Sequence, residues 1–80
     1  MSDFIMVYTT DSGLGGSFTV SIERQIDPEH VEVRIWYGRA TERGWESWRD
    51  FDGHRFAARL TDLRNPRLLV THKKETQHEP

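Results

Sequence analysis

Two stretches of this chain alternate between apolar and polar side chains. The apolar residues of the first share one parity and are Phe18, Val20, Ile22 and Ile26. Those of the second also share one parity and are Val31, Val33, Ile35 and Tyr37. A repeat of two places the apolar side chains on one face of an extended strand. The chain is therefore predicted to form a sheet with one buried face, with a turn over 27–30, where Pro28 suits the first corner.

Two more segments are predicted to be strands. Phe4 to Thr10 is rich in β-branched and aromatic residues, which favour strands. Thr41 to Gly44 predicts a hairpin turn, and Trp45 to Phe51 follows it as a predicted fourth strand.

A helix is predicted after the fourth strand. Asp52 is a candidate N-cap, because its carboxylate can accept hydrogen bonds from the first turn. Phe51 before the cap and Phe56 after it have the spacing of a hydrophobic staple. The predicted apolar stripe consists of Phe56, Leu60 and Leu63 with Ala57 alongside, facing away from Arg55, Arg59 and Asp62. Pro66 ends the helix.

The predicted fold class is α+β. An antiparallel meander of three to four strands packs on one helix, and 67–72 adds a C-terminal strand, in the order β-β-β-β-α-β. Eighty residues suffice for one domain with a thin core. We predict a single domain over 1–74 and a disordered polar tail over 75–80.

Composition favours some functions over others. The chain has no cysteine, no apolar run near the roughly 20 residues of a membrane span and no recognisable signal peptide. A cytoplasmic protein with no membrane partner is expected. The four histidines lack ligand spacing, and Gly13 to Gly16 is not followed by a phosphate-binding helix, so no metal or cofactor is predicted. Asp50 and Asp52 are a conceivable acid–base pair, but the chain is not expected to be an enzyme.

The aromatic residues carry the main functional prediction. Trp36 lies on the polar parity of its strand, so either a neighbouring segment covers it or a partner does. Trp and Arg are the residues that dominate binding energy at interfaces. The predicted partner-binding set is Arg34, Trp36, Arg39, Arg43, Trp45, Trp48 and Arg49. A protein or protein complex is the expected partner, and a homodimer is possible. The competing interpretation is that some of these tryptophans complete the core.

Charge supports an alternative function. The net charge is −2, but acidic residues dominate the first half and basic residues dominate 53–74. A single-strand DNA or RNA binder could use the Arg and Trp hairpin together with a basic helix. The residues assigned to that alternative are Arg55, Arg59, Arg64 and Arg67.

Two resemblances bear on these alternatives. The opening strand, Asp3 to Tyr8, and the Arg49 to Asp52 stretch are similar to a β-rich member of the small phage anti-CRISPR proteins. That resemblance implies an inhibitor that binds a CRISPR surveillance complex in the host cytoplasm. The order of four strands followed by a helix resembles PC4-like single-strand DNA binders, which often dimerise. This chain departs from them in its negative net charge and its additional strand over 67–72.

Overall fold

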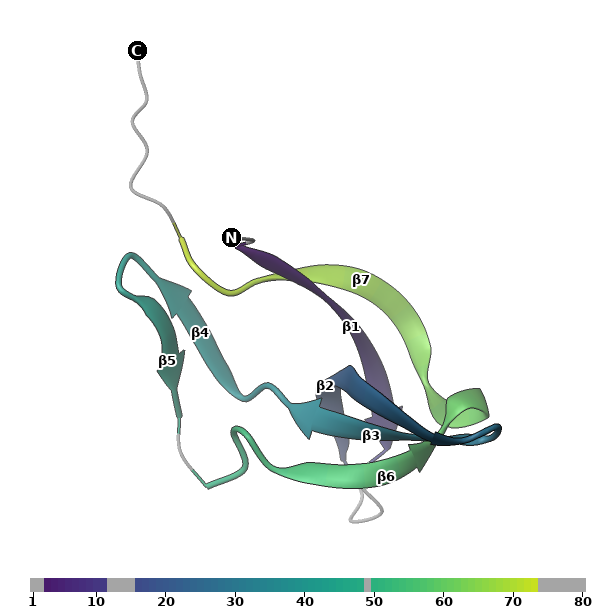
Figure 1. Cartoon of the computed structure of the whole chain (residues 1–80). Helices are drawn as coiled ribbons and strands as arrows, with labels where there is room; N and C mark the ends of the chain where they lie inside the picture. Colours follow the sequence, from purple (N-terminus) through teal and green to yellow (C-terminus); the bar gives the residue numbers. More distant parts are fainter. Residues whose placement is uncertain (1–2, 12–15, 49, 74–80) are drawn as a thin grey trace.

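The chain folds into a curled antiparallel sheet with one attached hairpin (Figure 1). The computed structural model describes residues 3–11, 16–48 and 50–73. The main sheet has five strands in the order β6-β3-β2-β1-β7, and β4 and β5 form a separate two-stranded sheet. The strands are β1 (Phe4–Asp11), β2 (Ser17–Asp27), β3 (His30–Ile35), β4 (Gly38–Thr41), β5 (Gly44–Ser47), β6 (Arg55–Arg59) and β7 (Arg64–Val70).

The predicted α-helix is wrong, and with it the predicted α+β class. The described residues contain no α-helix and only one short 3-10 turn, η1 (Leu60–Asp62). The segment expected to begin the helix is β6, which pairs with β3 so that Phe56 lies opposite Val33 and Ala58 lies opposite Val31. Apolar residues four apart also share the parity of a strand, so the spacing of Phe56 and Leu60 suited both structures. The segment forms a strand and not a helix because the backbone groups along the edge of β3 need hydrogen-bond partners.

The other predicted features of the helix differ too. Asp52 does not cap a helix; its carboxylate accepts a hydrogen bond from the backbone N–H of Tyr37 at 2.8 Å. Phe51 packs on Phe18, with ring centroids 5.5 Å apart. Pro66 lies within β7 rather than ending a helix. This position is an edge strand, where proline is tolerated because its missing N–H can face outward.

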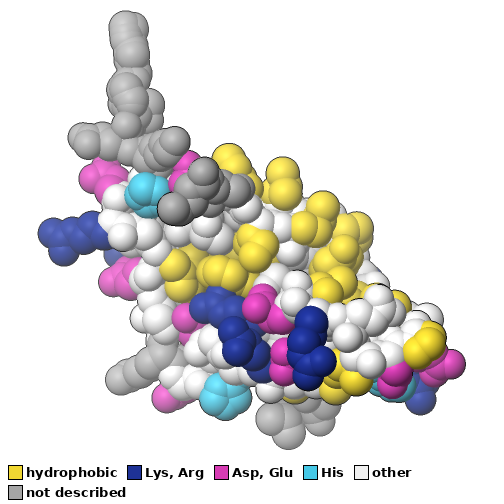
Figure 2. Space-filling view, in the orientation of Figure 1, with side chains coloured by type: hydrophobic (Ala, Val, Ile, Leu, Met, Phe, Trp, Pro, Cys, Tyr) yellow, Lys and Arg dark blue, Asp and Glu magenta, His cyan; other side chains and the backbone are white. Residues whose placement is uncertain are grey.

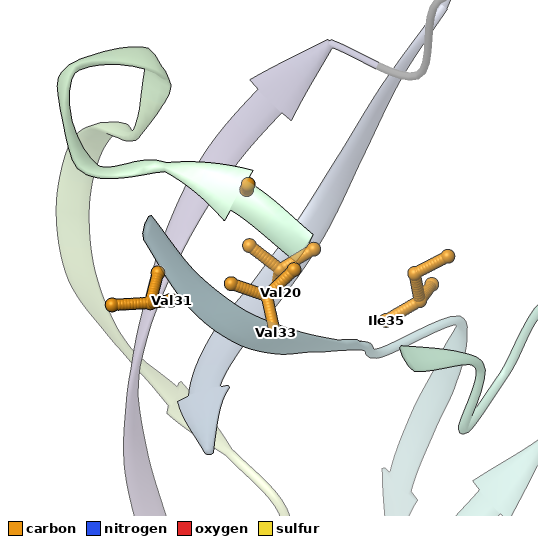
Figure 3. Packing of buried hydrophobic residues seen from close by; sticks show 5 residues of the cluster. Val20, Val31, Val33 and Ile35 are labelled. Carbon is orange, nitrogen blue, oxygen red and sulfur yellow. The ribbon is translucent and has the colours of Figure 1, made fainter. Parts of the chain in front are cut away.

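The main hydrophobic cluster lies on one face of the sheet. Val20 on β2 and Val33 and Ile35 on β3 are buried, as the alternating pattern predicted, but Ile22 and Ile26 of the same pattern are 38% and 43% exposed. Figure 3 shows these side chains with Val31, which emerge from the two adjacent strands and gather on one side. The partly buried residues packed against this cluster are Tyr8, Phe18, Phe56 and Leu63. Leu63 lies in the short link from β6 to β7, which are the two edges of the sheet, so this link curls the sheet around its core.

The hairpin of β4 and β5 departs from the predicted meander. The chain leaves the main sheet after Ile35 and forms the hairpin before it returns as β6. Thr41 side-chain Oγ1 donates to the carbonyl of Gly44 at 2.8 Å and accepts from the N–H of Arg43, which closes the turn. The hairpin tip meets the end of β7, where the N–H of Lys73 donates to the carbonyl of Thr41 at 2.9 Å. Figure 1 shows the hairpin standing across from β1 and β7.

The predicted tail over 75–80 lies outside the described residues. No helix of the described ranges is long and apolar enough to cross a bilayer.

Candidate partner-binding site

The structure divides the predicted partner-binding set into three groups. Arg34, Trp36 and Trp45 form a half-buried cluster between the sheet and the hairpin. Arg39 and Arg43 lie with Trp45 along an open groove of about 540 Å³ on the hairpin. Trp48 is half exposed beyond the end of β5, and Arg49 lies outside the described residues.

Arg34 and Trp36 stack on the face of the sheet opposite the core. The guanidinium carbon of Arg34 lies 3.6 Å from the centroid of the Trp36 ring, which is cation–π geometry. Trp45 meets Trp36 edge-on at 5.0 Å. The indole N–H of Trp36 donates to the hydroxyl of Ser21 at 2.9 Å. Trp36 is therefore shielded by a neighbouring segment, one of the two outcomes that its parity allowed.

Asp52 joins the hairpin to the sheet. Its carboxylate accepts from the N–H of Tyr37 at 2.8 Å and from the indole N–H of Trp45 at 3.1 Å. The guanidinium of Arg34 lies 3.6 Å from its other oxygen. Burial raises the pKa of Asp52, but the Tyr37, Trp45 and Ser47 hydrogen bonds and the Arg34 charge together bring it below the ordinary value. One carboxylate therefore ties both ends of the hairpin to β3.

Three exposed aromatic side chains gather where the hairpin returns to the sheet. Tyr37, Trp48 and Phe51 are 43%, 50% and 44% exposed, and we call them the aromatic patch. The Tyr37 ring meets Trp48 edge-on at 5.4 Å and Phe51 at 6.1 Å. The N–H of Trp48 donates to the carbonyl of Tyr37 at 3.0 Å, which holds the two chain ends of the hairpin together.

The loop after β5 is shaped so that Phe51 can reach the patch. Asp50 and Gly53 both have positive φ, 62° and 87°, a region that glycine adopts without strain. The N–H of Gly53 then donates to the carbonyl of Ile35 at 2.9 Å, which returns the chain to β3. The patch thus rests on the core through Phe51 and Phe18 and on the hairpin through Tyr37.

Comparison with protein-family models, curated proteins and solved structures finds no match to this chain.

Three of the four residues assigned to nucleic-acid binding contact other side chains. Arg55 lies 3.7 Å from Glu23, and Arg64 lies 3.0 Å from Asp11. Arg67 donates to the hydroxyls of Thr9 and Thr19. The basic helix that would have carried them is absent from the described residues. Figure 2 shows basic and acidic side chains interleaved on the visible face.

Sequence reasoning missed two members of the aromatic patch. Tyr37 was placed on the buried parity of its strand, but β3 ends at Ile35, two residues before it. Phe51 was assigned to a helix staple. The available signal was their position on either side of the hairpin, because residues that flank a hairpin come together in space.

Proposed function

We propose that this protein is a non-catalytic protein-binding module whose docking surface centres on the aromatic patch. The observation that carries the proposal is the exposure of Tyr37, Trp48 and Phe51 in one contiguous cluster. Aromatic side chains are enriched at the centres of interfaces, where a few of them carry most of the binding energy.

The geometry favours binding because the patch is already ordered. Edge-on stacking restricts the rotamers of Tyr37 and Trp48, and the hydrogen bond to the Asp52 carboxylate fixes the backbone of Tyr37. A partner therefore finds a rigid surface, and the entropy lost on binding is smaller than for a mobile loop.

The proposed partner is a host CRISPR surveillance complex. This part of the proposal rests on the resemblance of Asp3 to Tyr8 and Arg49 to Asp52 to the anti-CRISPR proteins. In that setting the protein acts as an inhibitor that occupies a surface of the complex.

Affinity capture from a nuclease-treated host extract tests the proposal. Three baits are compared: wild type, Trp48→Ala and Ile26→Ala. Ile26 is 43% exposed on the far part of β2, so its variant is a matched surface control. We expect wild type and Ile26→Ala to retain the same protein or complex and Trp48→Ala to lose it. Equal capture by all three baits would show that the aromatic patch is not the docking surface.

A further inference from the structure

The second half of β7 is an open sheet edge. One flank of β7 pairs with β1, where Met6 lies opposite Leu68 and Ile5 opposite Leu69. Within the described ranges, no strand pairs with its other flank. Natural sheets blunt such edges with charge, proline or irregular backbone. β7 has these features only in its first half, as Arg64, Asn65 with φ 58° and Pro66.

The register shows which backbone groups point outward. The N–H of Thr71 donates to the carbonyl of Asp3 at 2.8 Å and continues the ladder between β1 and β7. In an antiparallel ladder, hydrogen-bonded and non-hydrogen-bonded pairs alternate. Leu69 therefore bonds inward to β1, whereas the N–H and C=O groups of Leu68 and Val70 point away from it.

The side chains of this edge are apolar and exposed. Leu68 is 64% and Val70 40% exposed, and their partners across the ladder, Met6 and Phe4, are 46% and 52% exposed. We call these four residues the edge patch. Figure 2 shows hydrophobic side chains gathered on the side of the molecule where β7 runs in Figure 1. A contiguous exposed apolar patch of this kind marks an interaction surface.

We propose that β7 pairs antiparallel with β7 of a second copy of this chain, about a two-fold axis at Leu69. In this register Leu68 lies opposite Val70 of the second copy, and each such pair exchanges both backbone hydrogen bonds. The two edge patches join into one apolar stripe along the same face. The contact is isologous, so the pairing closes at two copies.

Three features of the edge fit a second copy in this register. The outward N–H and C=O groups of Leu68 and Val70 have the spacing of the same groups on a second, antiparallel β7. Arg67 would lie opposite Thr71 of the second copy, so no like charges oppose each other beside the axis. Pro66 has no N–H and lies at the end of this ladder, whereas a register shifted toward the start of β7 would bring it beside the axis, where it would interrupt the pairing.

The exposed area sets the strength of this contact. The edge patch consists of four partly exposed side chains per copy. A stable interface typically has about 20–30 residues a side and buries about 1,200 Å² or more. We therefore expect a weak, concentration-dependent dimer. Each dimer would carry two aromatic patches, and the pairing does not depend on the function proposed for them.

Sedimentation velocity of the full chain, from low micromolar to near-millimolar concentration, tests the dimer. Wild type should shift from monomer to dimer as concentration rises. Leu68→Lys should remain monomeric, because a charge on the edge opposes pairing, while the control Ile26→Lys should dimerise like wild type. A wild type that stays monomeric throughout, or a Leu68→Lys variant that still dimerises, would overturn the proposal. So would a monomer whose β7 edge binds only an extended apolar peptide.

Disulfide trapping tests the register. The chain has no cysteine, so Leu69→Cys introduces a unique thiol at the axis. A non-hydrogen-bonded pair has Cα atoms about 4.5 Å apart, which a disulfide can bridge. Under mild oxidation Leu69→Cys should cross-link at least tenfold faster than Leu68→Cys, whose thiol faces Val70 of the second copy. Equal rates for the two variants would rule out this pairing.

Discussion

Asp52 connects more parts of the molecule than any other side chain in the candidate site. It accepts hydrogen bonds from Tyr37 and Trp45 and lies beside Arg34. Asp52→Asn keeps an acceptor oxygen but removes the charge that faces the guanidinium. We expect the free energy of unfolding to fall by about 2 kcal/mol at neutral pH, as for other hydrogen bonds to charged groups. Urea denaturation of the two proteins measures this difference.

The effect of Asp52 should depend on pH in a defined direction. Its pKa is lowered in the folded state from the ordinary value of 3.8, although burial alone would raise it. A lowered folded-state pKa stabilises the protein fully above the unfolded-state pKa, and this contribution is lost as pH falls through the folded-state value. The stability gap between wild type and Asp52→Asn should therefore be constant above about pH 5 and shrink below pH 4. A gap that widens on acidification would contradict the assigned charge.

Gly38 makes a residue-scale prediction about the hairpin. A Cβ at this position would collide with the backbone carbonyl oxygen of Glu46 and crowd the Trp45 ring. Gly38→Ala should therefore cost roughly 1–3 kcal/mol, as other overpacking substitutions do. Gly16→Ala is the control, because nothing lies within 4 Å of its added methyl group. Thermal melts that show the two variants equally stable would contradict the close approach of β4 and β5.

Among the elements, β6 is the one where the observed strand and the predicted helix make different predictions. Ala58 is buried opposite Val31, whereas Ala57 is exposed opposite Glu32. Ala58→Lys should cost at least about 3 kcal/mol, because it buries an unpaired charge. Ala57→Lys should change stability by less than about 0.5 kcal/mol, as at other surface positions. In the predicted helix, Ala57 lies on the apolar stripe. If chemical denaturation shows that Ala57→Lys destabilises the protein more than Ala58→Lys, this segment is the predicted helix and not a strand.

The comparison of β3 with β6 shows how much the sequence could predict. The alternation of Val31, Val33 and Ile35 is typical of a strand and not of a helix. The predicted C-terminal end of β3 was therefore within two residues of the observed one. β6 has only Phe56 and Ala58 to mark its parity, whereas Phe56 and Leu60, four residues apart, fit either period. Its conformation is decided by pairing with β3, a long-range contact that local spacing does not contain.

The candidate site was predictable to a similar extent. Trp48 was predicted from composition and is exposed in the aromatic patch. Trp36 and Trp45 cover each other between sheet and hairpin, because the chain leaves the sheet after Ile35. Tyr37 and Phe51 come together only through the hydrogen bonds that close the base of the hairpin, so the patch depends on tertiary structure.

At the scale of the whole molecule, the pairing of charges predicts poor binding to nucleic acid. Among the described residues, five arginines have carboxylate partners within 4 Å: Arg24, Arg34, Arg39, Arg55 and Arg64. With a net charge of −2, we expect the dissociation constant for a random single-stranded oligonucleotide to exceed about 100 µM at physiological salt. Fluorescence anisotropy measures it. Tight binding with a log–log salt slope near −3, as for about four phosphate contacts, would favour the nucleic-acid alternative.

Titration calorimetry with the captured partner measures whether the aromatic patch is the docking surface. Wild type, Trp48→Ala and Ile26→Ala are each titrated after thermal melts have shown that all three proteins are folded. The aromatic patch predicts that Trp48→Ala loses about 2 kcal/mol of binding free energy, or roughly 30-fold in Kd, as a hot-spot residue does. Ile26→Ala should bind like wild type. If Trp48→Ala binds as tightly as Ile26→Ala, the partner docks elsewhere and the account of the site is wrong.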